Sequence, residues 1–142
     1  MSRRSPHGRL LVVGPGRLGL ALGGELLHLG LFAGIDFAGR SAAPPDHPLF
    51  ADDRVRHHPL DELEVTPGAI LLTVPDAAVE EVAGTLASAT IAPVSALHTS
   101  GALGAEALEP LAKRGFSTGS LHPLVSVAHP ARDALKLLGA WY

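Results

Sequence analysis

The hydrophobic residues of this chain fall into short continuous runs, which alternate with segments of helical periodicity. A continuous apolar run is typical of a strand that is buried on both faces, as strands are in a parallel sheet. Ala69–Val74 (AILLTV) is the clearest such run. The full set of predicted strands is Arg9–Val13, Phe32–Ala38, a short Val55–His57, Ala69–Val74, Pro93–His98 and Phe116–Leu121.

Between these runs, apolar residues recur every three or four positions, which predicts helices. Asp76 is a suitable N-cap for one of them. The predicted helices are Pro15 or Gly16 to His28, Ala77–Ala87, Gly104–Arg114 and Ala131–Leu138, with a single turn at Pro59–Leu63 and a Pro- and Asp-rich loop at 42–53. Because strands and helices alternate, we predict an α/β fold: a three-layer, doubly wound parallel sheet in residues 9–142, after a flexible arm of residues 1–8.

The composition is that of one globular domain with an aliphatic core. The 142 residues are 46% hydrophobic but only 4% aromatic, and this length is enough for one buried core. A net charge of −3 gives no electrostatic reason to expect nucleic-acid binding. No apolar run is long enough to span a membrane, and the glycines that interrupt the first run argue against a signal peptide. Since there is no cysteine, we expect no disulfide and no thiolate nucleophile, and a cytoplasmic location.

Three glycines follow the first predicted strand directly: Gly14, Gly16 and Gly19, in the spacing G-x-G-x-x-G. Between a strand and a helix, the first glycine permits a tight turn, the second lets the backbone approach a pyrophosphate, and the third lets the helix pack on the strand. The helix N-terminus, at Arg17 and Leu18, adds free N–H groups and a positive dipole end. In a glycine-rich chain the spacing alone arises easily by chance, but this context favours a nucleotide site over a purely structural turn.

The end of the second strand indicates which dinucleotide is bound. NAD-binding chains place a carboxylate there for the ribose 2′-hydroxyl, whereas an Arg accommodates the 2′-phosphate of NADP. Here the strand ends in Gly39, Arg40 and Ser41, and a guanidinium suits a phosphate. Asp36 lies three residues earlier, inside the strand rather than at its tip. Arg40 read alone is equally well an ordinary surface charge; with the glycines upstream, we predict NADP.

Further polar residues end predicted strands at the same edge of the sheet, where open α/β sheets bind ligands. Val74, Pro75 and Asp76 mark a strand end and a helix start, and they are also candidates for a wall of the cofactor site. His98 and His122 end neighbouring strands, and a neutral imidazole there is a candidate general acid. The other six histidines are interpreted as structural or exposed. A zinc site is not expected from two ligands, and no G-x-S-x-G hydrolase motif occurs.

The segments GPGRLG, AGRS, LLTVPDAAVEEVA, HTSGALGAEAL and GSLHPL together resemble a bacterial family of Rossmann-like oxidoreductases with a C-terminal helical domain of unknown function. This family is related to pyrroline-5-carboxylate reductase, ketopantoate reductase and deazaflavin-dependent NADP reductases. The resemblance covers nearly all of residues 9–142. It implies an NADP-type Rossmann domain with Gly14, Gly16, Arg17, Leu18, Gly19, Arg40 and Ser41 at the cofactor, and with Val74, Pro75, Asp76, His98, Ser100 and His122 lining the crevice.

Members of that family continue past the segment that matches Gly139–Tyr142 into a strand and a helical dimerisation domain, and here the sequence stops. In the related reductases the substrate lies between the two parts, so we expect residues 1–142 alone to bind cofactor with negligible turnover.

The sequence therefore predicts the NADP(H)-binding domain of an oxidoreductase that moves hydride to or from a small organic substrate. His98 and His122 are its candidate catalytic residues, and a homodimer is a candidate assembly. Two alternatives remain open: a non-catalytic nucleotide-binding or sensor module, and a domain for coenzyme A or another nucleotide. The substrate, and whether a deazaflavin is the hydride partner, are also open.

Overall fold

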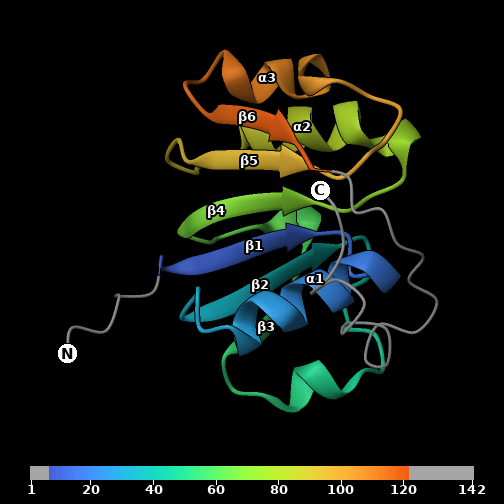
Figure 1. Ribbon diagram of the computed structural model, residues 1–142, viewed down its shortest axis with the longest axis vertical. Coiled ribbons are helices and arrows are strands. Elements are labelled where there is room, and N and C mark those ends of the chain that lie inside the picture. The colour runs from blue at the N-terminus through green and yellow to red at the C-terminus, as the bar shows by residue number, and fades with distance from the viewer. Residues whose placement is uncertain (1–6, 122–142) are drawn as a thin grey trace.

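Six parallel strands form a single sheet in the order β3-β2-β1-β4-β5-β6 (Figure 1). The computed structural model of the chain describes residues 7–121. The strands are β1 (Arg9–Val13), β2 (Gly34–Gly39), β3 (Val55–Pro59), β4 (Pro67–Leu72), β5 (Ser95–His98) and β6 (Ser117–Ser120). Every neighbouring pair is parallel, so all six carboxyl ends lie at one edge. The predicted doubly wound parallel sheet is confirmed, and the chain reverses direction across the sheet between β3 and β4.

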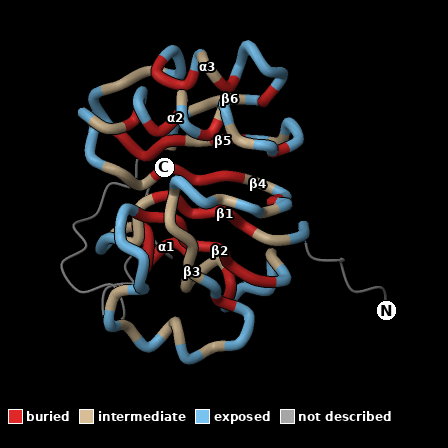
Figure 2. The backbone as a smooth tube through the Cα atoms, turned by 180° about the vertical axis from the view of Figure 1, so that it is seen from behind, coloured by how far each residue is buried: buried red, intermediate tan, exposed pale blue. Residues whose placement is uncertain are grey.

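Both faces of the central strands β1 and β2 are buried, which explains the continuous apolar runs in these strands. Leu10 and Val12 point to the face covered by α1 (Arg17–His28), where they join Ile35 and Phe37 in one apolar cluster. The alternate residues of β1 point to the opposite face and pack in a second cluster with α2 (Val79–Ser88) and α3 (Glu109–Ala112). Figure 2 shows these buried strands between the partly exposed helices. The three layers follow from the period-two alternation of side chains along a strand.

The predicted helix Gly104–Arg114 is not a single helix. A 3₁₀ turn at Ala105–Leu108 precedes the short α3. Pro110 accounts for the difference, because proline has no N–H to donate and is tolerated only in the first turn of a helix. Among residues 7–121, no helix is long and apolar enough to cross a membrane.

The ends of the predicted domain lie partly outside the described residues. In the predicted arm, the N–H of His7 donates to Leu31 at 2.9 Å, and the carbonyl of Gly8 accepts from Ala33 at 2.8 Å. These two residues are therefore attached to the loop that follows α1. His122 and the predicted helix Ala131–Leu138 lie outside the described range.

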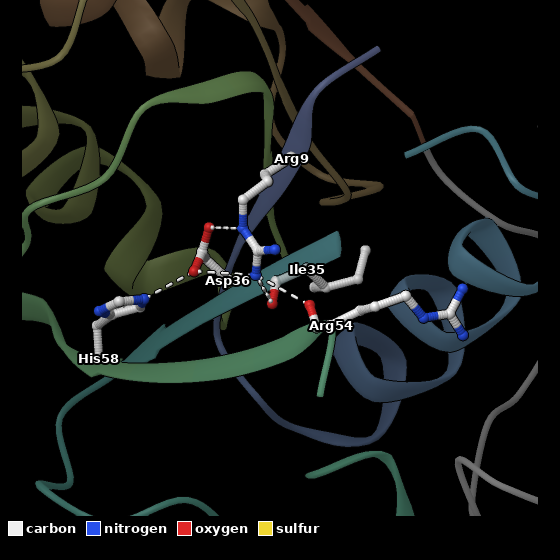
Figure 3. A network of polar contacts seen from close by, with 5 residues as sticks. All are labelled: Arg9, Ile35, Asp36, Arg54 and His58. Atoms are coloured by element: carbon white, nitrogen blue, oxygen red, sulfur yellow. Dashed lines mark hydrogen bonds and ion pairs between the residues drawn. The ribbon is translucent and has the colours of Figure 1, made fainter. Parts of the chain in front are cut away.

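A buried carboxylate joins the neighbouring strands β1, β2 and β3 (Figure 3). Asp36 on β2 is only 2% exposed. It accepts hydrogen bonds from Nε of Arg9 on β1 and from Nε2 of His58 on β3, each at 2.8 Å. Arg9 also donates to the backbone oxygens of Ile35 and Arg54. Asp36 therefore has a structural role inside the strand, and it is not the carboxylate at a strand tip that marks an NAD site.

The environment of Asp36 keeps it ionised. Burial by itself raises the pKa of a carboxyl group, but the hydrogen bonds and charges of Arg9 and His58 outweigh it and hold the pKa of Asp36 below its usual value of 3.8. A lowered folded-state pKa stabilises the fold at every pH above the unfolded-state value, and this stabilisation is lost as the pH falls through the folded-state value.

We expect Asp36→Asn to lower the free energy of unfolding at pH 7 by about 1.5–3 kcal/mol, because it removes a charged acceptor shared by two donors. The difference from wild type should shrink as the pH falls from 3.8 towards the lower folded-state pKa of Asp36, because the unfolded chain takes up the proton first. Urea unfolding across this range measures it. Asp52→Asn, which removes an exposed partner of Arg54, is the control and should change stability little. An equal loss in both variants would contradict the structural role of Asp36.

Candidate functional site

The carboxyl ends of β1, β2 and β4 enclose a cavity of about 600 Å³. Three segments that are far apart in sequence meet there: the glycine turn after β1, the end of β2, and the residues after β4. Six of the predicted site residues line this cavity: Gly14, Gly16, Arg40, Ser41, Val74 and Pro75. The edge of the sheet that sequence reasoning selected therefore does bring these residues together.

The turn after β1 is held against the end of β4. Gly14 has a φ of +105°, a conformation that favours glycine, and its N–H donates to Ala38 on β2 at 2.9 Å. The hydroxyl of Thr73 donates to the carbonyl of Gly14 at 2.7 Å, and the N–H of Thr73 donates to Val13 at 2.8 Å. These bonds connect β2, β1 and β4 at one point, so the direction in which α1 leaves the sheet is fixed there.

The last glycine of the motif lets α1 pack against this turn. A Cβ atom added to Gly19 would clash with the carbonyl oxygen of Gly14 and lie 2.5 Å from Oγ1 of Thr73. No real side chain tolerates such contacts with backbone atoms. Gly19 is therefore required by packing under the site, and it does not line the cavity.

Gly16 differs from the other two glycines because the fold itself does not require it. An added Cβ would meet nothing within 4 Å, and the backbone there is extended, at φ −85° and ψ −167°. Gly16 is the N-cap of α1, with no side-chain hydrogen bond to the helix and no acidic residue in the first turn. The N-terminus of α1 thus keeps backbone N–H donors for an anion, and the open space above Gly16 is where a bound group would lie.

The tip of β2 presents a cation to the same cavity. Arg40 and Ser41 are both exposed, and the Arg40 side chain makes no hydrogen bond or ion pair with any residue in 7–121. The backbone carbonyl of Ser41 is held by Nε2 of His57 on β3 at 2.8 Å. The guanidinium is therefore available to an external anion, while the backbone beside it is fixed.

A smaller and more apolar cavity of about 310 Å³ adjoins the first. It also contains Val74 and Pro75, and its other walls include Leu60, Ala78 and Val82. Since it is bounded by Arg40 as well, a flat apolar ring system would be enclosed between aliphatic side chains and a guanidinium.

Some predicted site residues lie elsewhere. Asp76 is exposed and lines neither cavity, and it does not act as the predicted N-cap: it is the first residue of a 3₁₀ turn (Asp76–Ala78), and neither that turn nor α2 has a side-chain cap. Arg17 and Leu18 form the first turn of α1 beside Gly16.

His98 is completely buried, and both of its ring nitrogens have partners. Nδ1 accepts from the N–H of Ser100 at 3.1 Å, so Nε2 carries the hydrogen, which it donates to the carbonyl of Gly104 at 2.8 Å. The hydroxyl of Ser100 accepts from the N–H groups of Ala102 and Leu103. These bonds organise the loop between β5 and the 3₁₀ turn. They do not support the predicted role of His98 as a group that touches substrate, and His122 lies outside the described residues.

Sequence reasoning missed Thr73 and His57. The apolar run predicts Thr73 inside a strand, whereas β4 ends one residue before it, so the Thr73 hydroxyl can bond the glycine turn. The sequence gives no signal that separates His57 from the histidines interpreted as structural. Its place one strand away from Arg40 is visible only once β2 and β3 are paired in register. Within residues 7–121, no group of three or more His, Cys, Asp or Glu residues could hold a metal ion.

The chain belongs to the Rossmann-like domain family, whose model matches residues 3–123. Among solved structures it is similar to a candidate NADP oxidoreductase from Bacteroides fragilis, with 16% identity, a TM-score of 0.64, and coverage of 84% of this chain and 44% of that one. It is also similar to a dimeric ketopantoate reductase from Staphylococcus aureus, with 18% identity, a TM-score of 0.48, and coverage of 83% and 43%. No curated protein matched the sequence.

The family match confirms the resemblance, and the likeness to the Bacteroides protein agrees with the fold. The chain spans less than half the length of both solved proteins. At this level of identity the likeness to the Bacteroides protein shows the fold alone, so the chemistry of this chain has to be argued from its own residues.

Proposed function

We propose that this chain is the NADP(H)-binding domain of an oxidoreductase that transfers hydride to or from a small organic substrate. The observation that carries the proposal is that, within residues 7–121, a helix N-terminus without a side-chain cap and an arginine without a partner open into the same cavity. An NADP-type cofactor carries two separated anionic groups, a pyrophosphate and a 2′-phosphate, and this cavity offers a partner for each. The name of the Bacteroides neighbour agrees with this class of cofactor.

The glycine turn fits the pyrophosphate. The open space at Gly16 lets the cofactor come close to the backbone, and the first N–H groups of α1, from Arg17 and Leu18, point out of the helix end. Gly14 and Gly19 allow that end to lie directly over the sheet. No acidic residue in the first turn competes with the phosphates.

The residues at the tip of β2 suit the 2′-phosphate and the adenine ring of the cofactor. Arg40 can bind a phosphate with two parallel N–H groups, and the hydroxyl of Ser41 can donate beside it. The adjoining apolar cavity between Val74, Pro75 and Val82 fits the adenine ring. With no carboxylate at the strand tip, the ribose of NADPH suits this site better than that of NADH.

The nicotinamide would supply the hydride chemistry itself, and the protein would orient it. We assign His98 and Ser100 a positioning role, because their hydrogen bonds order the loop after β5. The N–H of Thr99 in this loop donates to the carbonyl of Leu72, so the loop is attached to the end of β4, beside the cofactor cavity. A homodimer and a cytoplasmic location stay predictions from the sequence.

NADPH should bind more tightly than NADH, and Arg40→Ala should remove that preference. Loss of one charge-assisted phosphate contact costs about 1.5–3 kcal/mol, or roughly 10- to 150-fold in Kd, while NADH binding should hardly change. Titration calorimetry with both cofactors measures this. Arg54→Ala is the matched control, since Arg54 is also exposed but pairs with Asp52 away from the cavity. If wild type binds NADH as tightly as NADPH, the assignment of Arg40 is wrong.

Gly16→Val should abolish dinucleotide binding and leave the fold intact. The valine side chain would occupy the space that the pyrophosphate needs, whereas the extended backbone tolerates it at a cost of no more than about 1 kcal/mol. Gly19→Ala provides the contrast: its Cβ strikes the Gly14 carbonyl, so it should lose about 1–3 kcal/mol of stability. Thermal unfolding and NADPH titration of both variants separate the two roles. If Gly16→Val bound NADPH normally, the glycine motif would serve only to pack α1 on the sheet, and the pyrophosphate assignment would be wrong.

A further inference from the structure

We propose that His57 is a positioning residue that sets the preference of the site for a 2′-phosphorylated cofactor, by holding the backbone at Ser41. The proposal rests on the proposed NADP(H) function. It adds a specificity residue on β3, a strand that contributes neither to the glycine motif nor to the pair Arg40 and Ser41.

In the hydrogen bond between His57 and Ser41, the histidine must be the donor. The acceptor is the backbone carbonyl oxygen of Ser41, 2.8 Å from Nε2, so the ring must donate from Nε2. Nδ1 is buried and has no partner among the described residues, which suits an unprotonated ring nitrogen. The ring is therefore used as a single donor aimed at the strand-tip loop.

The ring is itself held in place from the core. Its neighbour Phe50 lies edge-on to it, with ring centroids 6.2 Å apart, and Phe50 packs on the fully buried Phe37 at 5.4 Å. Phe37 belongs to β2, two residues before Gly39. A row of three rings thus connects the core under β2 to the loop that follows the same strand.

The loop has little else to hold it. No other hydrogen bond joins residues 40–46 to the rest of the described chain, and most of these residues are exposed. Arg40 and Ser41 would both have to be ordered around a phosphate, and the entropy of ordering them lowers affinity. A carbonyl fixed by His57 removes part of that cost in advance. The benefit falls on a cofactor that carries the 2′-phosphate, since NADH has no group for Arg40 and Ser41 to bind.

The next residue provides an internal control. His58 follows His57 directly on β3 and points to the opposite face of the sheet, where it binds Asp36. It lines neither cavity. His58→Gln keeps an amide donor for Asp36, so it changes a histidine of the same strand without touching the Ser41 loop.

The test is calorimetric titration of wild type, His57→Phe, His57→Gln and His58→Gln with NADPH and with NADH. Phenylalanine keeps the ring packing on Phe50 and loses the donor, so Kd for NADPH should rise roughly 3- to 10-fold with NADH within twofold of wild type. Glutamine can place an amide donor near the position of Nε2 and should restore most of the preference. His58→Gln should behave as wild type.

Other outcomes overturn the proposal in distinguishable ways. A wild-type protein without NADPH preference would defeat the proposed function itself. With that preference present, an unchanged NADPH-to-NADH ratio in His57→Phe, or an equal loss for both cofactors, would overturn the role of His57 alone. Should His57→Phe fail to fold, His57→Asn replaces it, because its shorter amide cannot reach Ser41, and it must then show the same change in the ratio.

Discussion

The close approach of α1 to the end of β4 is the constraint on which the rest of the site depends. The carbonyl of Gly14 accepts from the hydroxyl of Thr73, and Gly19 lies so near both that a Cβ has no room. This contact determines where the first N–H groups of the helix point. It also leaves Gly16 as the one motif glycine whose missing side chain opens space instead of filling a packing need. The cavity at the sheet edge is a consequence of that geometry.

The second half of the site depends on how β2 and β3 end. Their register places Phe37 beside His57, and the ring of His57 reaches forward to the loop that carries Arg40 and Ser41. On the other face of the same two strands, Asp36 binds His58 and Arg9. The two neighbouring histidines of β3 thus make separate contacts: His57 binds the backbone of the loop at Arg40 and Ser41, and His58 binds the buried carboxylate that joins β1, β2 and β3.

Much of this arrangement could be predicted from the sequence, for identifiable reasons. Buried parallel strands are continuous apolar runs, and parallel strands place their carboxyl ends together, so Gly16, Arg40 and Val74 could be assigned to one edge. The type of a single residue was less informative about its role. Aspartate is common at N-caps, but Asp76 does not cap a helix here, and Pro110 divides a segment whose pattern predicts a single helix. His98 lies at the carboxyl edge of the sheet, yet both of its ring nitrogens bind its own loop. The roles of Thr73 and His57 depend on contacts between strands, which a single sequence does not reveal.

Amide NMR of the ¹⁵N-labelled chain during titration with NADPH shows whether the N-terminus of α1 is the pyrophosphate site. The largest shifts should fall on the backbone amides of Gly16, Arg17 and Leu18, with further shifts at Arg40 and Ser41. Saturable binding that left the amides of Gly16 to Leu18 unmoved would contradict this assignment.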